Sequence, residues 1–300
     1  MTWQPPNGAE IGAQRVGLAR RRLALARWTQ MLLLLAVGFG LAVGALIGLD
    51  WLVWIALVLA MLWVFLVVRS ARLLRRVREA WGALQIGRPD MAEARALEAL
   101  QAPTLLRPVT HSALMVLAAA AAKQARHEEA AQLAAFVLSR GERLLVGDRA
   151  GAQMLLAESL LVMGQLQGAR AAMMPLYAMR LSLNDAVRLL LLQLRLEAQL
   201  GAYGSMLDRL GAKIDMADLL PGPESAIAQA LLGLAARRSG LIDWAQWLWR
   251  RVNLLADWAT LGAREPVLAG LGAGFAPIDA PAKSSAAGEH PLDEASPAGS

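Results

Sequence analysis

The chain has 300 residues, of which 57% are hydrophobic, a net charge of +6 and no cysteine. The missing cysteine excludes disulfides, thiolate nucleophiles and cysteine-based metal sites together. A basic balance can indicate nucleic-acid binding, but the excess lies in two short segments. Residues 1–28 and residues 69–82 each hold five arginines against one glutamate, whereas residues 83–275 are nearly neutral. This distribution favours a lipid bilayer with anionic headgroups, and not nucleic acid, as the partner.

Residues 29–68 predict a transmembrane helical hairpin. They comprise two apolar runs of 21 and 18 residues, and Asp50 between the runs is their only ionisable residue. As helices the runs would reach about 32 and 27 Å, close to the ~30 Å hydrocarbon core of a bilayer. The alternative is a hairpin buried in a large soluble core.

Arginines flank both ends of this hairpin, and its turn has no basic residue. The positive-inside rule therefore predicts that both termini are in the cytoplasm. We expect the membrane to be a bacterial-type inner (plasma) membrane. Residues 1–28 form a basic juxtamembrane leader. From Ile11 to Trp28 we expect a helix that lies on the membrane face.

The first apolar run carries small residues at a regular helical spacing. Gly40, Gly44 and Gly48 recur every four residues and therefore share one helix face. Such a face allows another helix to approach closely. We expect the second span to pack there, with a homo-oligomer as the alternative.

Helix formers continue past Val68, so we expect the second membrane helix to run on into a soluble domain at residues 69–275. Gly87 is the first credible break. Asp90 with Glu93 then predicts a capping box at the start of the next helix. Through the rest of the domain, apolar residues fall at three- and four-residue spacing without an alternating β run, which predicts an all-α fold.

An internal repeat emerges when the helix–helix turns are aligned. Each turn contains a small residue, and successive turns are 38, 39, 37 and 39 residues apart. Five positions later stands an alanine, or once a methionine, that lets the second helix pack closely on the first. The turn residues are Gly87, Ala125, Gly164, Gly201 and Gly240, and the packing residues are Ala92, Ala130, Ala169, Met206 and Ala245. The pattern predicts five stacked helical hairpins; the alternative is a chance alignment of turns in an all-helical protein.

This pattern resembles the tetratricopeptide repeat, in which a large and a small residue precede a glycine turn, an alanine and a bulky residue. Ala230–Trp249 is the best copy, and the resemblance covers roughly residues 72–256 with a period longer than the family's ~34 residues. It implies an α-solenoid scaffold that binds a partner protein. The membrane hairpin with Leu200–Lys213 is also similar to the HemY proteins, inner-membrane proteins linked by name to haem biosynthesis. That resemblance implies, as the alternative, an accessory role in membrane-associated tetrapyrrole metabolism.

Motifs of catalysis are missing from the sequence. There is no GxxxxGK[ST] and no GxSxG, and residues 270–276 depart from GxGxxG. His111 and His127 are isolated on predicted helices and indicate no metal cluster. Glu128 and Glu129 are adjacent and point about 100° apart on a helix, which favours solvated carboxylates over a catalytic pair. We expect a protein that is not an enzyme and has no catalytic residues, metal or cofactor.

A binding surface remains as the candidate site. In the resembled family, the first helices of the hairpins line a concave groove. The corresponding polar positions here are Lys123, Glu158, Arg188, Arg195, Arg237 and Arg238, and the apolar ones are Met115, Ala119, Met154, Leu191, Ala230 and Leu234. Because arginine pairs bidentately with carboxylates, the resemblance implies capture of an acidic or C-terminal segment of a partner protein. The alternative is ordinary solvated helix surface.

Two features lie towards the C-terminus. Four tryptophans crowd the last hairpin, namely Trp244, Trp247, Trp249 and Trp258. We expect them in the core, with an exposed docking patch as the alternative. Residues 276–300 are rich in Pro, Ala, Ser and Gly and predict a disordered acidic tail.

Overall fold

The computed structural model describes residues 8–47, 50–102, 107–140 and 146–269, and every regular element among them is a helix. The predicted all-α class is therefore confirmed. The α-helices are α1 (Gly8–Ile47), α2 (Asp50–Gln85), α3 (Pro89–Gln101), α4 (Arg107–Lys123), α5 (His127–Ser139), α6 (Val146–Val162), α7 (Leu166–Met173), α8 (Leu183–Leu200), α9 (Tyr203–Leu207), α10 (Leu210–Asp218), α11 (Gly222–Arg238), α12 (Ile242–Leu255) and α13 (Trp258–Arg264). Two 3₁₀ turns, η1 (Met174–Ala178) and η2 (Pro266–Leu268), complete the described elements.

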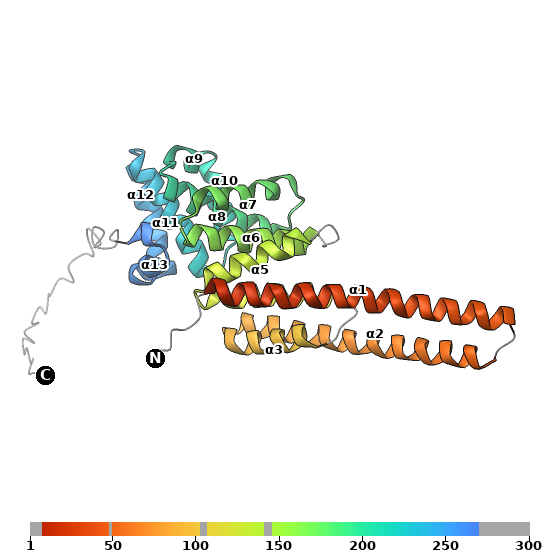
Figure 1. Cartoon of the computed structure of the whole chain (residues 1–300). Helices are drawn as coiled ribbons and strands as arrows, with labels where there is room; N and C mark the ends of the chain where they lie inside the picture. The colour runs from red at the N-terminus through yellow and green to blue at the C-terminus, as the bar shows by residue number, and fades with distance from the viewer. Residues whose placement is uncertain (1–7, 48–49, 103–106, 141–145, 270–300) are drawn as a thin grey trace, which may run out of the picture.

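Helices α1 and α2 are each long and apolar enough to cross a membrane. They run side by side, and one end of the pair projects beyond the rest of the molecule (Figure 1). In their most apolar 18-residue windows only 6% and 11% of the residues are buried, so these apolar segments are not packed in the core of the described structure. Phe39, Trp54 and Phe65 are between 60% and 71% exposed. This exposed apolar surface fits the predicted hairpin better than the soluble-core alternative.

Both long helices are continuous. α2 runs unbroken from the apolar span into the hairpin domain, as predicted. α1 likewise joins the basic leader and the first apolar run in one helix. The leader is not the expected surface helix, because it packs on α4 and α5. Gly12, Val16, Ala19 and Leu23, spaced by three and four residues, give it a packing stripe of its own.

The five predicted turns share one backbone geometry. They fall at Gly87, Ala125, Gly164, Gly201 and Gly240, where φ lies between 59° and 80°. At Ala125, for example, the amide donates to the Ala122 carbonyl at 3.1 Å, and the following amide donates to the Ala121 carbonyl at 2.8 Å. These two bonds are the Schellman motif, and all five turns form them. The packing residues Ala92, Ala130, Ala169, Met206 and Ala245 are each at most 1% exposed. The turn positions are therefore confirmed.

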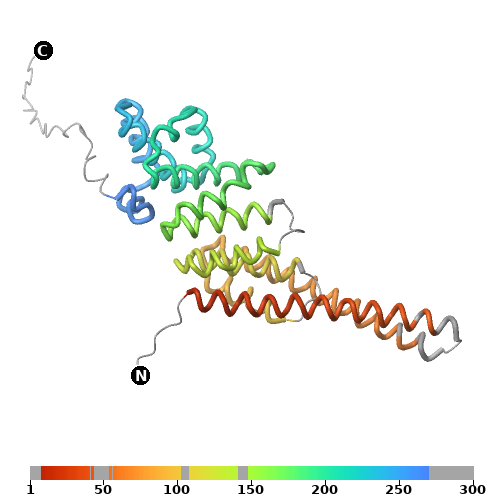
Figure 2. Tube along the Cα trace, turned by 45° about the horizontal axis from the view of Figure 1, so that its top comes forward, coloured from red at the N-terminus to blue at the C-terminus, as the bar shows by residue number. Residues whose placement is uncertain are grey.

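These turns join five helix pairs, α2–α3, α4–α5, α6–α7, α8–α9 and α11–α12. The first helices of successive pairs contact one another in chain order: α2 with α4, α4 with α6, α6 with α8, and α8 with α11. Figure 2 shows the pairs following one another away from α1 and α2. α10 packs on α8 and α11, and α13 packs on α11.

The start of α3 differs from the predicted capping box. Its N-cap residue is Arg88, and no side chain caps the helix. Asp90 instead accepts a hydrogen bond from Gln124 Nε2 at 2.6 Å. Glu93 pairs with two arginines from other elements. Because the helix begins at Pro89, Asp90 lies inside its first turn and is not the N-cap, and both carboxylates make tertiary contacts instead.

The buried apolar side chains form two large clusters. One lies among α1 to α6 and includes Leu100, Leu114 and Leu117. The other lies among α8 to η2 and includes Leu194 and Leu231. A smaller cluster joins α6, α7 and α8. The hairpins thus share a nearly continuous interior, with one large cluster towards each end of the row.

Candidate functional site

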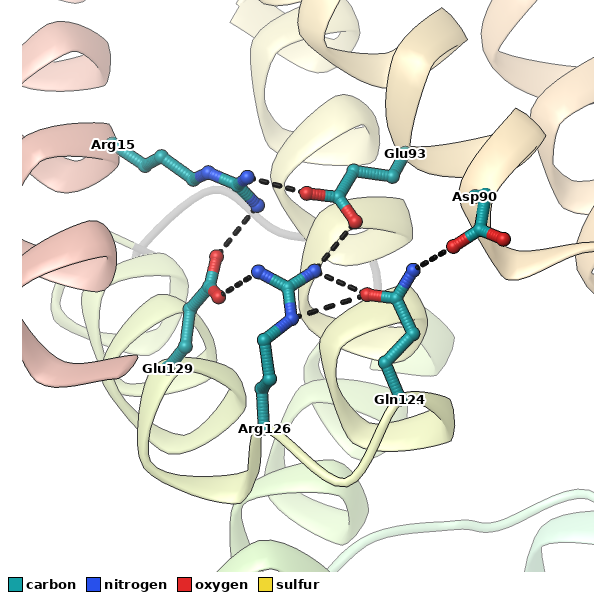
Figure 3. A network of polar contacts seen from close by, with 6 residues as sticks. All are labelled: Arg15, Asp90, Glu93, Gln124, Arg126 and Glu129. Atoms are coloured by element: carbon teal, nitrogen blue, oxygen red, sulfur yellow. Dashed lines mark hydrogen bonds and ion pairs between the residues drawn. The ribbon is translucent and has the colours of Figure 1, made fainter. Parts of the chain in front are cut away.

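Four charged side chains form a closed ring where α1 meets the first two hairpins (Figure 3). Arg15 comes from α1, Glu93 from α3, Arg126 from the α4–α5 turn and Glu129 from α5. Arg15 Nη1 lies 2.6 Å from Glu129 Oε1, and Arg126 Nη2 lies 2.5 Å from Glu93 Oε2. The pairs Arg15–Glu93 and Arg126–Glu129 complete the ring. Each arginine therefore contacts both carboxylates, and the charge ring is neutral as a whole.

The charge ring is largely shielded from water. The Glu129 side chain is fully buried, and those of Arg15, Glu93 and Arg126 are 13%, 16% and 25% exposed. Burial raises the pKa of Glu129, although Arg15 and Arg126 oppose the shift. For Glu93, burial also acts to raise the pKa, but the same two arginines outweigh it and the pKa is lowered. Removing one member would leave a buried charge without compensation.

Neighbouring residues fix the position of the charge ring. Arg126 Nε donates to Gln124 Oε1 at 3.1 Å, which links the ring to the Gln124–Asp90 hydrogen bond. Gly12 allows the close approach of α1, since a Cβ there would lie 2.4 Å from Gln132 Oε1. The predicted solvated position of Glu129 is wrong. One feature of the sequence could have indicated this burial. Arg15 lies beside the small and apolar stripe by which the leader packs, and an arginine at such a position needs a carboxylate partner.

A second charge cluster includes one of the predicted groove arginines. Arg195 on α8 places Nε 2.5 Å from Glu265 Oε1 and Nη1 3.6 Å from Glu158 Oε1. Glu265 follows α13, and its side chain is only 7% exposed. Burial raises the pKa of Glu265, Arg195 opposes this, and the Glu158 carboxylate adds to it. Arg195 thus already binds a carboxylate that a later segment of the chain presents.

The other predicted basic positions are not drawn into this cluster. Lys123, Arg188 and Arg238 are exposed, and none forms a hydrogen bond or ion pair with Glu158 or Arg195. Within the described ranges these three cations pair with no carboxylate. Arg237 instead lies over the Trp249 ring, 5.7 Å from its centroid.

The apolar positions predicted to line the groove belong mostly to the core. Those at most 9% exposed are Met115, Met154, Leu191, Ala230 and Leu234, and Ala119 is half-buried. This part of the prediction is wrong, because neighbouring first helices pack directly against one another and cover these faces.

The tryptophans of the last hairpin divide between core and surface. Trp249 is 5% exposed, which agrees with the predicted core position. Trp244 and Trp247 are 45% and 43% exposed, so the core prediction is wrong for them. Their rings meet edge to face with centroids 5.7 Å apart, and Arg251 lies 4.8 Å from the centroid of Trp247. Trp258 is half-buried.

The predicted membrane contacts are described only in part. Gly40 is buried, and α1 packs on α2, as packing of the two spans requires. The surroundings of Gly44 and the whole of Gly48 lie outside the described residues. The predicted tail at 276–300 lies outside them too. The expectation of no metal site also stays a prediction, although no three His, Cys, Asp or Glu side chains gather in the part of the chain that is described.

No protein-family model, curated protein or solved structure matches this chain. The resemblances to the tetratricopeptide repeat and to HemY therefore stay predictions. A spectral change of added haem on titration with the full-length chain would support the second. The class that the structure defines is an all-α protein with two candidate membrane-crossing helices, the second of which continues into the first of five helical hairpins.

Proposed function

We propose that this chain is a membrane-anchored scaffold whose stacked, tetratricopeptide-like hairpins bind an acidic segment of a partner protein. The observation that carries this proposal is the Arg195–Glu265 pair, 2.5 Å apart, in which a first helix binds a carboxylate from outside the hairpins. Charge-assisted pairing of this kind is the chemistry that capture of an acidic peptide needs. Lys123, Arg188 and Arg238 add exposed cations on first helices of the same row.

The anchor gives this surface a fixed place relative to a bilayer. α2 passes from the apolar span into the first hairpin as one helix. The charge ring makes a second link, since Arg15 joins α1 to α3 and α5. Two such links hold the hairpins in one orientation to the spans, which lowers the entropic cost of presenting a bound partner at the membrane. In this proposal the membrane is a bacterial-type inner membrane, and the hairpins and both termini are cytoplasmic.

The test is in-cell crosslinking of the full-length chain, purified in detergent, with mass spectrometry of the attached proteins. The variant carries Arg188→Glu and Arg238→Glu, two exposed positions without a described carboxylate partner. The matched control carries Arg170→Glu and Arg180→Glu, which are exposed on α7 and just after η1. We expect one or more partners to be lost in the first variant alone. Retention of every partner in both variants would refute the proposed surface, and equal loss would indicate unspecific charge attraction.

Anchoring is tested separately, by carbonate extraction and by labelling. Because the chain has no cysteine, a single Ser239→Cys substitution in the exposed α11–α12 turn gives one labelling position. We expect a membrane-impermeant maleimide to label it only after cells are opened. Labelling in intact cells would contradict the cytoplasmic placement, and release by carbonate would contradict the anchor.

A further inference from the structure

A pocket of about 410 Å³ lies where the apolar part of α2 ends. α2 contributes Phe65, Val68, Arg69, Arg72 and Arg76 to its lining, and α3 contributes Glu98 near its C-terminal end. The volume is within the roughly 300–1,000 Å³ typical of small-ligand sites. The pocket therefore joins the last turn of a candidate membrane span to the first turns of the hairpin domain.

The polar side of this pocket is strongly basic. Arg69, Arg72 and Arg76 are spaced by three and four residues and share one face of α2. Arg76 pairs with Glu98, and both side chains are more than half exposed. Arg69 and Arg72 are exposed and pair with no carboxylate in the described part of the chain. With three arginines against one glutamate, the pocket has a net charge of +2.

The other side of the pocket is apolar. Phe65 and Val68 are 60% and 46% exposed, and they belong to the run that ends at Val68. Two guanidinium groups without a carboxylate partner among the described residues thus lie within about two helical turns of an exposed apolar surface. A complementary ligand has an anionic head and an apolar tail.

We propose that this pocket binds the phosphate headgroup of one anionic phospholipid, with the acyl chains lying along Phe65 and Val68. Guanidinium forks match phosphate oxygens in geometry and charge. When α2 crosses a bilayer, Arg69 and Arg72 come directly after the hydrocarbon-spanning run and so lie at headgroup depth. The proposal rests on the membrane anchoring proposed above but not on capture of a protein partner.

The test is native mass spectrometry of the full-length chain, released from detergent micelles. One sample contains phosphatidylglycerol and a parallel sample contains the same amount of phosphatidylcholine. We expect one phosphatidylglycerol retained per chain and little phosphatidylcholine. Arg69→Gln with Arg72→Gln should lower retention about 25-fold, since each juxtamembrane arginine contributes about fivefold. Arg75→Gln with Arg78→Gln removes the same charge from exposed positions of α2 outside the pocket and should leave retention nearly unchanged.

A second variant is expected to bind more lipid, and such a gain cannot be explained by misfolding of the variant. Glu98→Gln removes the one carboxylate among the described residues that line the pocket and frees Arg76, so we expect about fivefold higher retention of phosphatidylglycerol. Equal loss in the two double variants would overturn the proposal in favour of diffuse surface attraction. Equal retention of both lipids would also overturn it, and displacement by millimolar inorganic phosphate would assign the pocket to a free anion. None of these outcomes depends on whether a protein partner binds.

Discussion

Glu129 and Glu265 are both buried, and each joins an outlying segment to the hairpins. Glu129 contacts Arg15 of α1 and Arg126 of its own hairpin, inside a neutral ring of four charges. Glu265, in the segment after α13, pairs with Arg195 and with no other cation in the described part of the chain, and Arg195 also lies 3.6 Å from Glu158 Oε1. At the N-terminal junction, where α1 meets α3 and α5, the four charges thus neutralise one another. At the C-terminal junction, where the segment after α13 meets α8, a single arginine holds the carboxylate, and a partner's carboxylate could also engage that arginine.

Apolar packing supports both junctions. Ala19 of α1 is fully buried, and Val16 and Leu23 pack beside it against the first core cluster. Leu261 and Leu268 flank Glu265 in the chain, and each is 1% exposed. The segment that carries Glu265 is therefore held in the core by an apolar side chain on each side of it. The comparison predicts that loss of charge harms the N-terminal junction more than the C-terminal one.

Arg126→Met is expected to have the largest effect. It removes one partner from both Glu93 and Glu129 and leaves buried carboxylate charge undercompensated, at a cost of about 3 kcal/mol. Thermal unfolding in detergent, followed by tryptophan fluorescence, should show a Tm lower by about 6–12 °C. Arg195→Met should cost less, because it removes an ion pair from one buried carboxylate, whereas Arg126→Met removes one from each of two.

The control for this prediction is an exposed pair. Arg95 and Glu79 lie 3.5 Å apart with side chains 40% and 60% exposed. Arg95→Met should cost under about 1 kcal/mol. If Arg95→Met and Arg126→Met lower the Tm equally, the charge ring does not close the N-terminal junction.

Gly233→Ala is expected to destabilise the last hairpin, at the C-terminal end of the row, through a steric clash and not through loss of a charge. A Cβ at Gly233 would lie 2.4 Å from Trp249 Nε1 and 2.8 Å from Trp249 Cδ1. The indole is buried and rigid, so we expect destabilisation of about 1–3 kcal/mol by overpacking. Gly211→Ala on α10 meets nothing within 4 Å and should be neutral or stabilising by up to ~1 kcal/mol. Equal Tm values for the two variants would mean that Trp249 can move aside.

The hairpin turns could be predicted from the sequence because their requirements are local. A left-handed turn residue favours glycine, and close packing five positions later favours alanine. The charge ring could not be predicted in this way, since Arg15 and Glu129 are 114 positions apart and meet only when α1 docks on α5. Among the groove residues, Arg195 was predicted to bind a carboxylate, but which segment supplies it is decided by tertiary packing. Leu191, predicted to line the groove, instead contacts neighbouring helices in the core.

The pH dependence of stability should separate the members of the two junctions. The pKa of Glu265 is raised above its ordinary value of 4.5, so its ionised form costs stability, and this cost is relieved as the pH falls towards 4.5. Wild type should therefore gain Tm relative to Glu265→Gln between about pH 7 and pH 5. The pKa of Glu93 is lowered, so its contribution is present above 4.5 and is lost as the pH falls below that value.

Each glutamate-to-glutamine variant is compared with wild type at every pH, so that titration elsewhere cancels. Glu129→Gln should follow Glu265→Gln in sign, because burial raises both pKa values. Opposite slopes for these two variants would mean that the arginines of the charge ring outweigh the burial of Glu129.

The smallest expected effects compare two equivalent turns, the second and the last of the row. Ala125 has φ 59°, which costs a residue with a Cβ about 1–2 kcal/mol, and glycine avoids that strain but loses more entropy on folding. Ala125→Gly should therefore stabilise the chain by about 0.5–1 kcal/mol. Gly240→Ala should destabilise it by about 1 kcal/mol through backbone strain alone, since a Cβ there meets nothing within 4 Å. The Tm should rise by about 1–4 °C in the first variant and fall by about 2–4 °C in the second. A fall in both would mean that the Ala125 methyl group contributes packing that offsets its strain, and the second turn would then differ from the last in how it is stabilised.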